Sequence, residues 1–479
     1  MHETTLARAL RLSLFVAPLA MSCGSRSGIV CSDADCELLA PSDGGTGGSA
    51  GAPVGSGGSP AGAGGTGIIG EPARPDPPDV VDDPAAVTSA RCRDDGRYDG
   101  SLTIRTSADL ARLQGCSVVD GSLSIVDLAT DDLSEAASLT TVTGKLRLGF
   151  LGTLDGLEGV SSVGSLELIG LDVPALGPLR GLTEVTTGRL TISQLRGVPD
   201  LRGLGGVAQW SEIAIDDAGS LESLRGLSVQ RQLRLLAITN SPGLPSLVAL
   251  AGLGRVDRLL LANLTITSLE GFAGLTQVDL LTLDTLPNLT DLTPLTNLES
   301  VDEIVFNNTG VLNLSGLERL RQANLVVLQS NPNLLEIDAL ASVQQMTALT
   351  VAYNATLQRL PAFSALASRR MQIIAVENNP SLVSGPAFDI ENIDSLLFTN
   401  NALLTAIDGF PLLERATSIN IDSNPSLTSV DLSGLTSVGA LVIRCNASLA
   451  EASVEPLRAL ATDAADISGN LGSAVTCVP

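Results

Sequence analysis

Histidine is almost missing from this chain of 479 residues, in which His2 is the only one. Without imidazole, a mature chain cannot run Ser-His-Asp or Cys-His catalysis, and it has no histidine to bind a metal ion. Aromatic residues make up only 2% of the sequence, and Lys145 is its only lysine. The formal net charge of −24 would repel phosphate groups. These absences argue against nucleic-acid partners and against several enzyme classes, and we expect no cofactor.

Long apolar runs are also missing, and the run at residues 12–20 is too short to span a bilayer. Two arginines precede it, and small residues lead to Cys23. This order predicts an export signal over residues 1–22. A cysteine directly after the cleavage region resembles a bacterial lipoprotein signal, which implies a lipid anchor on Cys23 in the outer membrane or at the cell surface. Ordinary secretion is the alternative, because Ala20 stands where such signals prefer leucine.

Residues 23–91 have the composition of a flexible tether. About half of the residues from Gly44 to Gly70 are glycine, and a segment rich in proline and aspartate follows. Such a composition cannot bury enough apolar surface to offset the entropy of ordering. We therefore predict a disordered tether between the anchor and the folded body.

The seven cysteines are an odd number. If Cys23 carries lipid, the other six form three local pairs, namely Cys31–Cys36, Cys92–Cys116 and Cys445–Cys477. An exported protein meets an oxidising compartment, so we expect these pairs to be disulfides. The two larger loops would each contribute about 3–4 kcal/mol in the chain-entropy account.

A short sequence phrase recurs from Cys92 to the end. It consists of two apolar residues separated by one other residue, followed about six residues later by a leucine. Leu281, Leu283 and Leu289 form one example. About 17 copies follow one another at intervals of about 20–26 residues, which is the spacing of a leucine-rich solenoid. One copy cannot bury its own apolar edge, so the copies must stack. For residues 92–479 we predict an α/β leucine-rich solenoid with a parallel β-sheet and short helical or irregular convex segments.

Two features divide this repeat. It is least regular at residues 202–232, which we interpret as a bend or a module junction. In the C-terminal half, asparagine recurs three residues after the last inward strand position, and we predict a buried structural ladder that bonds backbone groups between coils. Its members are Asn331, Asn354, Asn379, Asn401, Asn424, Asn446 and Asn470. In the N-terminal half the same position holds Leu128, Leu151, Leu171 and Leu195.

The middle residue of each strand phrase should face outward, because side chains alternate along a strand. The later coils place apolar residues there, next to polar or aromatic residues at the strand ends. An apolar strip rimmed by amides suits a protein or glycan partner, although β-branched residues also simply fit a flat sheet. The candidate binding face consists of Leu260, Val305, Val327 and Leu397, with Asn263, Asn308, Tyr353, Asn378 and Asn400 beside them.

Two other functions compete with recognition. A polysaccharide-acting enzyme without histidine would need two carboxylates about 5–9.5 Å apart. Asp216 and Asp217 are the best candidates, but neighbouring coils offer Ser193 and Thr239 rather than a second acid. A structural envelope spacer is the other alternative, and it should tolerate the deletion of central coils.

The opening coils resemble the receptor L-domain, the leucine-rich module of insulin-receptor and epidermal-growth-factor-receptor ectodomains. The resemblance lies in Cys92, Leu110, Leu113 and the phrases at residues 102–104 and 116–125. The later Asn-Pro-Ser-Leu phrases are similar to fungal cell-wall proteins of the same superfamily. The resemblance implies a right-handed solenoid, with one or two L-domain modules, that serves recognition outside the cell. The lipoprotein-like start points to a bacterial relative, so we expect a cell-surface lipoprotein that binds protein or glycan.

Overall fold

The computed structural model describes residues 92–128, 132–229, 231–473 and 477, and two short strands before them. These strands, β1 (Val30–Cys31) and β2 (Cys36–Glu37), pair antiparallel with Cys31 opposite Cys36. They belong to a separate compact unit, Leu12–Ala90. The predicted signal, the Cys23 anchor, most of the tether and the side chains of Cys31 and Cys36 lie outside the described residues.

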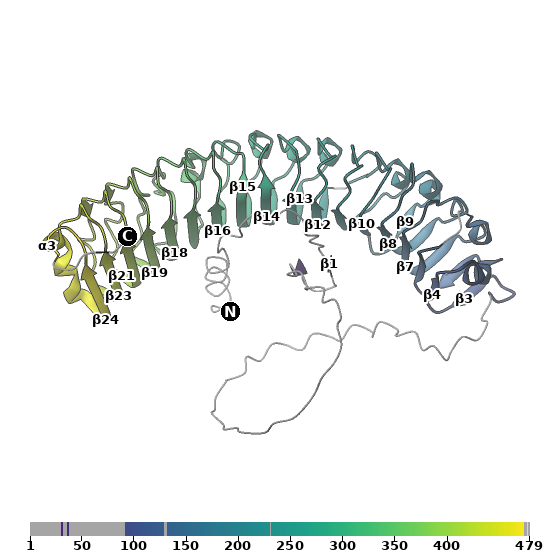
Figure 1. The fold of residues 1–479 in the computed structure, drawn as a ribbon, viewed down its shortest axis with the longest axis horizontal. Helices are drawn as coiled ribbons and strands as arrows, with labels where there is room; N and C mark the ends of the chain where they lie inside the picture. The colour runs from purple at the N-terminus through teal and green to yellow at the C-terminus, as the bar shows by residue number, and fades with distance from the viewer. Residues whose placement is uncertain are drawn as a thin grey trace, which may run out of the picture. The chain divides into compact units, whose positions relative to one another are not determined.

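The repeats form an arc of stacked coils whose strands line the concave side (Figure 1). One sheet contains 20 strands, and neighbouring strands are parallel. This confirms the leucine-rich solenoid. Its strands are β3 (Arg97–Asp99), β4 (Leu102–Ile104), β5 (Val118–Asp120), β6 (Leu123–Val126), β7 (Thr141–Gly149), β8 (Ser162–Ile169), β9 (Glu184–Val185), β10 (Arg189–Ser193), β11 (Glu212–Asp216), β12 (Gln232–Thr239), β13 (Arg255–Ala262), β14 (Gln277–Leu286), β15 (Ser300–Thr309), β16 (Gln322–Gln329), β17 (Ala348–Ala352), β18 (Arg370–Glu377), β19 (Asn392–Thr399), β21 (Arg415–Asp422), β23 (Ser437–Arg444) and β24 (Ala461–Ser468).

The sheet is continuous through the stretch that we interpreted as a junction. β11 pairs in parallel with β10 on one side and with β12 on the other, in unbroken register. Trp210 lies in the same stretch and is buried in the core. Outside the main sheet of the solenoid, β20 (Ala406–Ile407) and β22 (Ser429–Val430) pair as a small two-stranded sheet.

The convex side consists of short helical turns and irregular segments. The α-helices are α2 (Ser107–Leu110) and α3 (Glu451–Val454). The 3-10 turns are η1 (Ala111–Leu113), η2 (Ser134–Ala136), η3 (Gly177–Gly181), η4 (Arg202–Leu204), η5 (Val248–Leu250), η6 (Glu270–Phe272), η7 (Thr293–Leu295), η8 (Asp338–Ser342) and η9 (Glu455–Leu460). Within the described ranges, no helix has the length and apolarity to cross a membrane.

The core consists of the inward strand residues together with the leucines of the convex turns. Leu281, Leu283 and Leu289, for example, are fully buried, and most of their counterparts in the other coils are buried as well. Each such side chain contributes about 1.5–3 kcal/mol before the entropy of ordering. The aromatic residues of this core include Phe363 and Phe388, whose rings stack with centroids 4.6 Å apart.

Each coil turns away from its strand through one residue with a left-handed backbone. This column starts at Asp127 and ends at Gly469, with φ between 49° and 69°. Glycine and asparagine adopt this conformation at little cost, whereas other side chains meet steric strain. The column consists of Asp127, Phe150, Gly170, Gln194, Asp217, Asn240, Asn263, Thr285, Asn308, Ser330, Tyr353, Asn378, Asn400, Ser423, Cys445 and Gly469.

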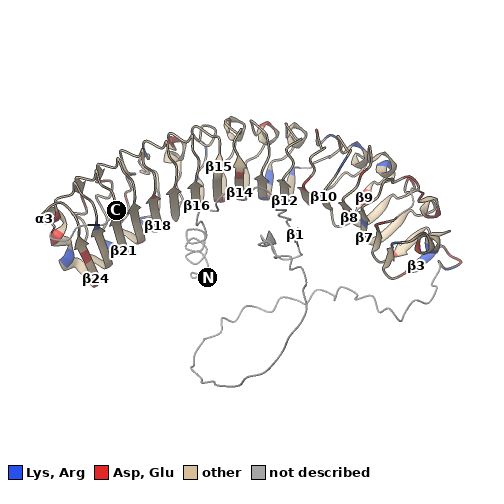
Figure 2. Ribbon diagram, viewed as in Figure 1, with Lys and Arg blue, Asp and Glu red and all other residues tan. Residues whose placement is uncertain are grey.

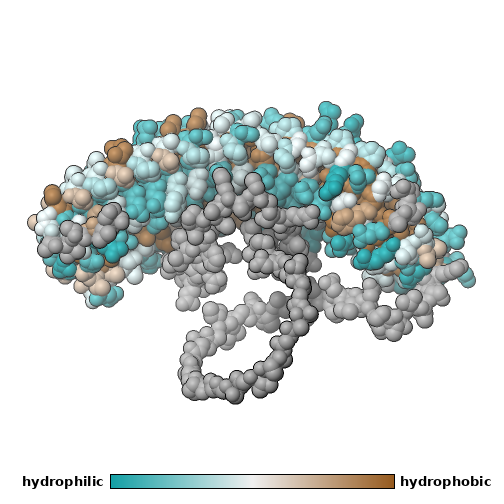
Figure 3. All heavy atoms as spheres, in the orientation of Figure 1, coloured by the Kyte–Doolittle hydropathy of each residue, from teal (hydrophilic) through white to brown (hydrophobic). Residues whose placement is uncertain are grey.

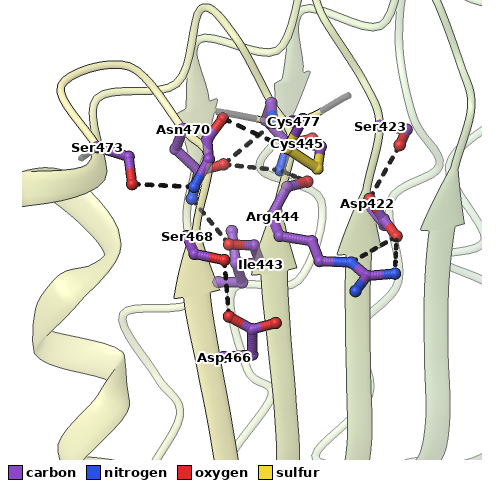
Figure 4. Close-up of a disulfide and its surroundings, with 12 residues drawn as sticks. Asp422, Ser423, Ile443, Arg444, Cys445, Asp466, Ser468, Asn470, Ser473 and Cys477 are labelled. Carbon is purple, nitrogen blue, oxygen red and sulfur yellow. Dashed lines mark hydrogen bonds and ion pairs between the residues drawn. A yellow bond between two sulfur atoms is a disulfide. The ribbon is translucent and has the colours of Figure 1, made fainter. Parts of the chain in front are cut away.

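Both ends of the solenoid are closed by disulfides. Cys92 joins Cys116 around the first coil, and Cys445 joins Cys477 around the last, with Cα atoms 5.5 and 5.6 Å apart. Figure 4 shows that the C-terminal disulfide lies beside Asn470, the last member of the asparagine ladder. Gly469 is needed there for two reasons: its φ is 69°, and any side chain would collide with the Cys477 sulfur.

The outer edge of β24 is blocked by an arginine. Arg458 donates hydrogen bonds to the carbonyls of Ala465 and Ile467, each at 3.1 Å. Its guanidinium also pairs with Glu455 at 2.7 Å and lowers the pKa of that carboxyl. These two carbonyls are acceptors that a further parallel strand would use, and open edges invite pairing with another chain. Arg458 therefore terminates the sheet.

Substituting methionine for Arg458 should expose this edge. In sedimentation velocity, we expect the sedimentation coefficient of Arg458→Met to rise with protein concentration more steeply than that of the wild type, because the variant self-associates. Arg444→Met is the matched control, because Arg444 pairs with Asp422 on the sheet face rather than at the edge. Equal sedimentation of all three proteins would show that the arginine does not protect the edge.

Candidate functional site

The predicted asparagine ladder is buried, and its bonds run from coil to coil. The Asn379 side-chain amide donates to the carbonyls of Val351 and Glu377 at 2.9 and 3.0 Å. Its own backbone N–H donates to the Asn401 side-chain oxygen at 3.1 Å. Five of the other six members are as deeply buried, and Asn470 is 5% exposed. The ladder thus satisfies backbone groups that parallel stacking would leave unpaired, and it is structural.

Two further polar residues extend this column toward the N-terminus. Thr309 donates to the Asn331 side-chain oxygen through both its backbone N–H and its hydroxyl, at 3.0 and 2.6 Å. Ser241 accepts from the backbone N–H of Ala218 at 3.2 Å. They are absent from the predicted ladder because neither of them is an asparagine. Their position in the repeat could have identified them, since each lies three residues after the last inward strand residue, as the ladder asparagines do.

The outward face of the sheet carries a hydrophobic cluster over β15–β19, which we call the concave patch. β16 and β17 contain no charged residue (Figure 2). The concave patch consists of Leu325, Val327, Ala348, Ile373 and Ala375, with Val305 and Leu397 packed against it. It therefore includes three of the four apolar residues of the predicted binding face. The fourth, Leu260, lies farther along the same outward row on β13 and is partly buried.

We expected the Val327 side chain to be exposed, but only 5% of the residue's surface is accessible to solvent. The other members of the concave patch pack around it. Leu325 and Ile373 were missed because the recurring phrase marks three residues, whereas β16 and β18 are eight residues long. In a longer strand the next outward position lies two residues before the middle residue of the phrase. Val305 and Leu397 stay partly accessible and are the better positions to probe.

The polar residues predicted beside the strip have a backbone explanation. Asn263, Asn308, Tyr353, Asn378 and Asn400 all occupy the left-handed column, with φ between 52° and 58°. Asparagine is common at such positions because it tolerates this conformation. The Asn263 side chain also donates to the Asn240 side-chain oxygen at 2.9 Å. The backbone conformation therefore explains the four asparagines without a ligand. It does not explain Tyr353, because a bulky side chain is strained in this conformation.

Glu377 places one carboxylate at the border of the concave patch. Glu377 lies on β18. Its register partner on β17 is Ala352, and its register partner on β19 is Thr399, and neither of them carries charge. Burial raises the pKa of the Glu377 carboxyl above its ordinary value, and no other cause contributes. At pH values between the pKa of this carboxyl in the unfolded chain and its higher pKa in the folded protein, the folded state binds more protons. The free energy of unfolding therefore falls as the pH rises through that range. Charged Glu377 is therefore a net cost to the fold at neutral pH.

The sequence offered Asp216 and Asp217 as candidate catalytic carboxylates, and the structure gives each another role. Asp216 accepts from the Thr239 hydroxyl at 2.6 Å and from the Asn240 amide at 2.7 Å. Asp217 occupies the left-handed column with φ 51°. The register neighbours of Asp216 are Ser193 and Thr239, so the sheet brings no second acid to it from either side. Among the described residues, no group of three or more His, Cys, Asp or Glu side chains could hold a metal ion.

Apolar side chains are exposed away from the sheet as well. Figure 3 shows separate hydrophobic residues along the outer edge of the arc. Val248 on η5 is the most accessible of the large ones, at 61%. Single exposed residues of this kind are ordinary on protein surfaces, whereas a contiguous cluster is informative.

No protein-family model and no curated protein matches the chain. Solved structures of similar fold include an internalin from Listeria monocytogenes, with 16% identity, a TM-score of 0.35, and coverage of 70% of this chain and 86% of that one. A leucine-rich-repeat protein of Leptospira interrogans has 14% identity, a TM-score of 0.34, and coverage of 74% and 91%. A plant peptide hormone receptor, solved in complex with its peptide, has 14% identity, a TM-score of 0.34, and coverage of 78% and 69%. These likenesses concern the leucine-rich fold.

Proposed function

We propose that this chain is an exported recognition protein whose concave patch binds an apolar surface of a protein partner. The observation that carries the proposal is the hydrophobic cluster on the outward side of the sheet, which is centred on β16 and β17, two strands without charged residues. In a chain with a net charge of −24, a contiguous outward apolar cluster is not explained by the core. Interface centres are typically depleted of charge in the same way.

Protein suits this surface better than glycan does. The amides that suggested glycan recognition belong to the left-handed column, and Asn263 already bonds Asn240. Leu325, Val327 and Ile373 offer no hydrogen-bonding side chain to a sugar. Val305 and Leu397 stay partly accessible, and burying their apolar area against an apolar partner is favourable at about 25 cal/mol per Å². Glycan binding is therefore the second candidate, and the spacer is the third.

Peptides selected on the wild-type protein from a displayed random library would test the concave patch. We expect Val305→Glu and Leu397→Glu each to weaken the selected peptides at least about 30-fold, because burying an unpaired charge costs about 2 kcal/mol or more. Val248→Glu on the convex side is the matched control and should leave the affinity unchanged. Equal affinity for all variants, or a loss only in Val248→Glu, would contradict the proposal.

Export and anchoring are part of the same proposal. Two disulfides at the ends of the solenoid suit an oxidising compartment. We propose that Cys23 carries lipid and that residues 23–91 hold the solenoid away from the membrane as a tether. The intact mass of the protein from its native host tests this directly. A diacylglyceryl adduct on a chain that starts at Cys23 is expected, and an unmodified cysteine would leave only secretion.

A further inference from the structure

Tyr353 occupies its position at a cost. Its φ is 58°, and the same position holds Asn378 and Asn400 in the next two coils. A bulky side chain in the left-handed region is strained where asparagine is not. The ring does not recover this cost by burial, since the residue is 48% exposed. Strain kept at an exposed position is a reason to look for a function.

The other aromatic residues in comparable places have structural uses. Phe150 also has a left-handed backbone, but its ring lies over Gly170 in the next coil, where any side chain would collide with it. The second tyrosine of the chain, Tyr98, is only 7% exposed. The Arg112 guanidinium lies 5.7 Å from its ring centroid and donates to its hydroxyl at 2.7 Å. Tyr98 thus already holds a cation from its own chain.

Glu377 adds a negative charge at the same place. In the part of the chain that the structure describes, its carboxylate makes no hydrogen bond or ion pair, and its pKa is raised by burial alone. The Tyr353 backbone N–H donates to the Glu377 carbonyl at 3.0 Å. The two residues therefore stand on adjacent coils, and neighbouring strands are about 4.8 Å apart. Ala352 and Ala375, both buried, supply the apolar surroundings.

We infer that Tyr353 and Glu377 together receive one arginine or lysine side chain of the partner protein, at the border of the concave patch. This inference rests on the proposed function and names the charge that the partner must carry. A cation there meets the face of an aromatic ring and a carboxylate that lacks a counter-charge. The buried Ala352 and Ala375 beside the Glu377 carboxylate strengthen its attraction for a cation. The partner segment is apolar, with one cationic residue.

The experiment uses the full chain labelled with 3-fluorotyrosine, which gives only two fluorine resonances because the sequence has two tyrosines. The probes are acetyl-Leu-Arg-Leu-amide and the same peptide with citrulline, the neutral isostere of arginine. We expect the arginine peptide to shift the Tyr353 resonance and to leave that of Tyr98 in place. The citrulline peptide should bind at least tenfold more weakly.

Glu377→Gln should remove the preference for arginine over citrulline. Tyr353→Asn should weaken arginine binding at least fivefold, while its melting temperature equals or exceeds that of the wild type, because asparagine suits the backbone. A merely structural tyrosine would instead show a lower melting temperature. Equal shifts with both peptides, or no shift of the Tyr353 resonance, would overturn the inference.

The outcomes separate this inference from the proposed function. If both peptides bind equally and Leu397→Glu abolishes that binding, the concave patch is a binding surface without a cation receptor. If the arginine peptide binds equally well to Leu397→Glu and the wild type, the receptor acts without the concave patch and the proposed function fails.

Discussion

Replacing Asn379 with leucine should lower the free energy of unfolding by about 3–5 kcal/mol. The substitution removes the side-chain oxygen that accepts from the Asn354 backbone N–H and side-chain amide, at 3.0 and 3.2 Å. It also removes the side-chain amide that donates to the carbonyls of Val351 and Glu377. Each buried group left unsatisfied costs about 1–3 kcal/mol, and at least two are created. Urea unfolding followed by far-UV circular dichroism measures the change.

The neighbouring residue provides the control for this prediction. Asn378 has φ 56° and lies outside the ladder, so Asn378→Gly should stay within about 0.5 kcal/mol of the wild type. A second test uses coupling: the double variant Asn354→Leu with Asn379→Leu should cost less than the sum of the single variants, because they share the same bonds. Strict additivity would show that the ladder is not one connected network.

Removing the C-terminal disulfide should destabilise the last coils selectively. In the chain-entropy account a separation of 32 residues between Cys445 and Cys477 is worth about 3–4 kcal/mol. Solenoid coils contact mainly their neighbours, so the loss should stay local. We expect Cys445→Ser with Cys477→Ser to speed amide exchange in β23, β24 and α3, and to leave β14 and β15 unchanged.

The N-terminal disulfide is the matched comparison for this test. Cys92→Ser with Cys116→Ser should speed exchange in β4 and β6 and leave β24 unchanged. Faster exchange along the whole arc in either variant would mean that the coils unfold as one unit. No change at either end would mean that the disulfides do not stabilise the caps.

The fold was predictable because the same physical requirement returns in every coil. Inward residues such as Leu281 and Leu283 repeat at a spacing that only stacked parallel strands can bury. The asparagine ladder was visible for the same reason, since seven residues share one register position. Cys445 and Cys477 stood out because each lies near the end of the repeat.

The candidate site was harder to predict because outward residues carry no such periodic requirement. The strand phrase marks one outward residue per coil, so Leu325 and Ile373 escaped attention and Val327 was expected to be exposed. A left-handed backbone conformation cannot be read from the sequence alone. The asparagines of the left-handed column were therefore interpreted as ligand-binding residues. Tyr353, with its φ of 58°, is the one residue of the predicted binding face whose place in that column the tolerance of asparagine does not explain. The export signal, the anchor and the Cys31–Cys36 pair stay predictions.

Photo-crosslinking in the native host tests the central claim, that the concave face is the recognition surface. Benzoylphenylalanine would replace Val305 on the concave face, Leu397 beside the concave patch, or Val248 on the convex side, one position per strain. We expect the same partner protein to be crosslinked at the two concave positions, identified by mass spectrometry, and no such adduct at Val248. An adduct at Val248 alone, or equal adducts at all three positions, would contradict the claim.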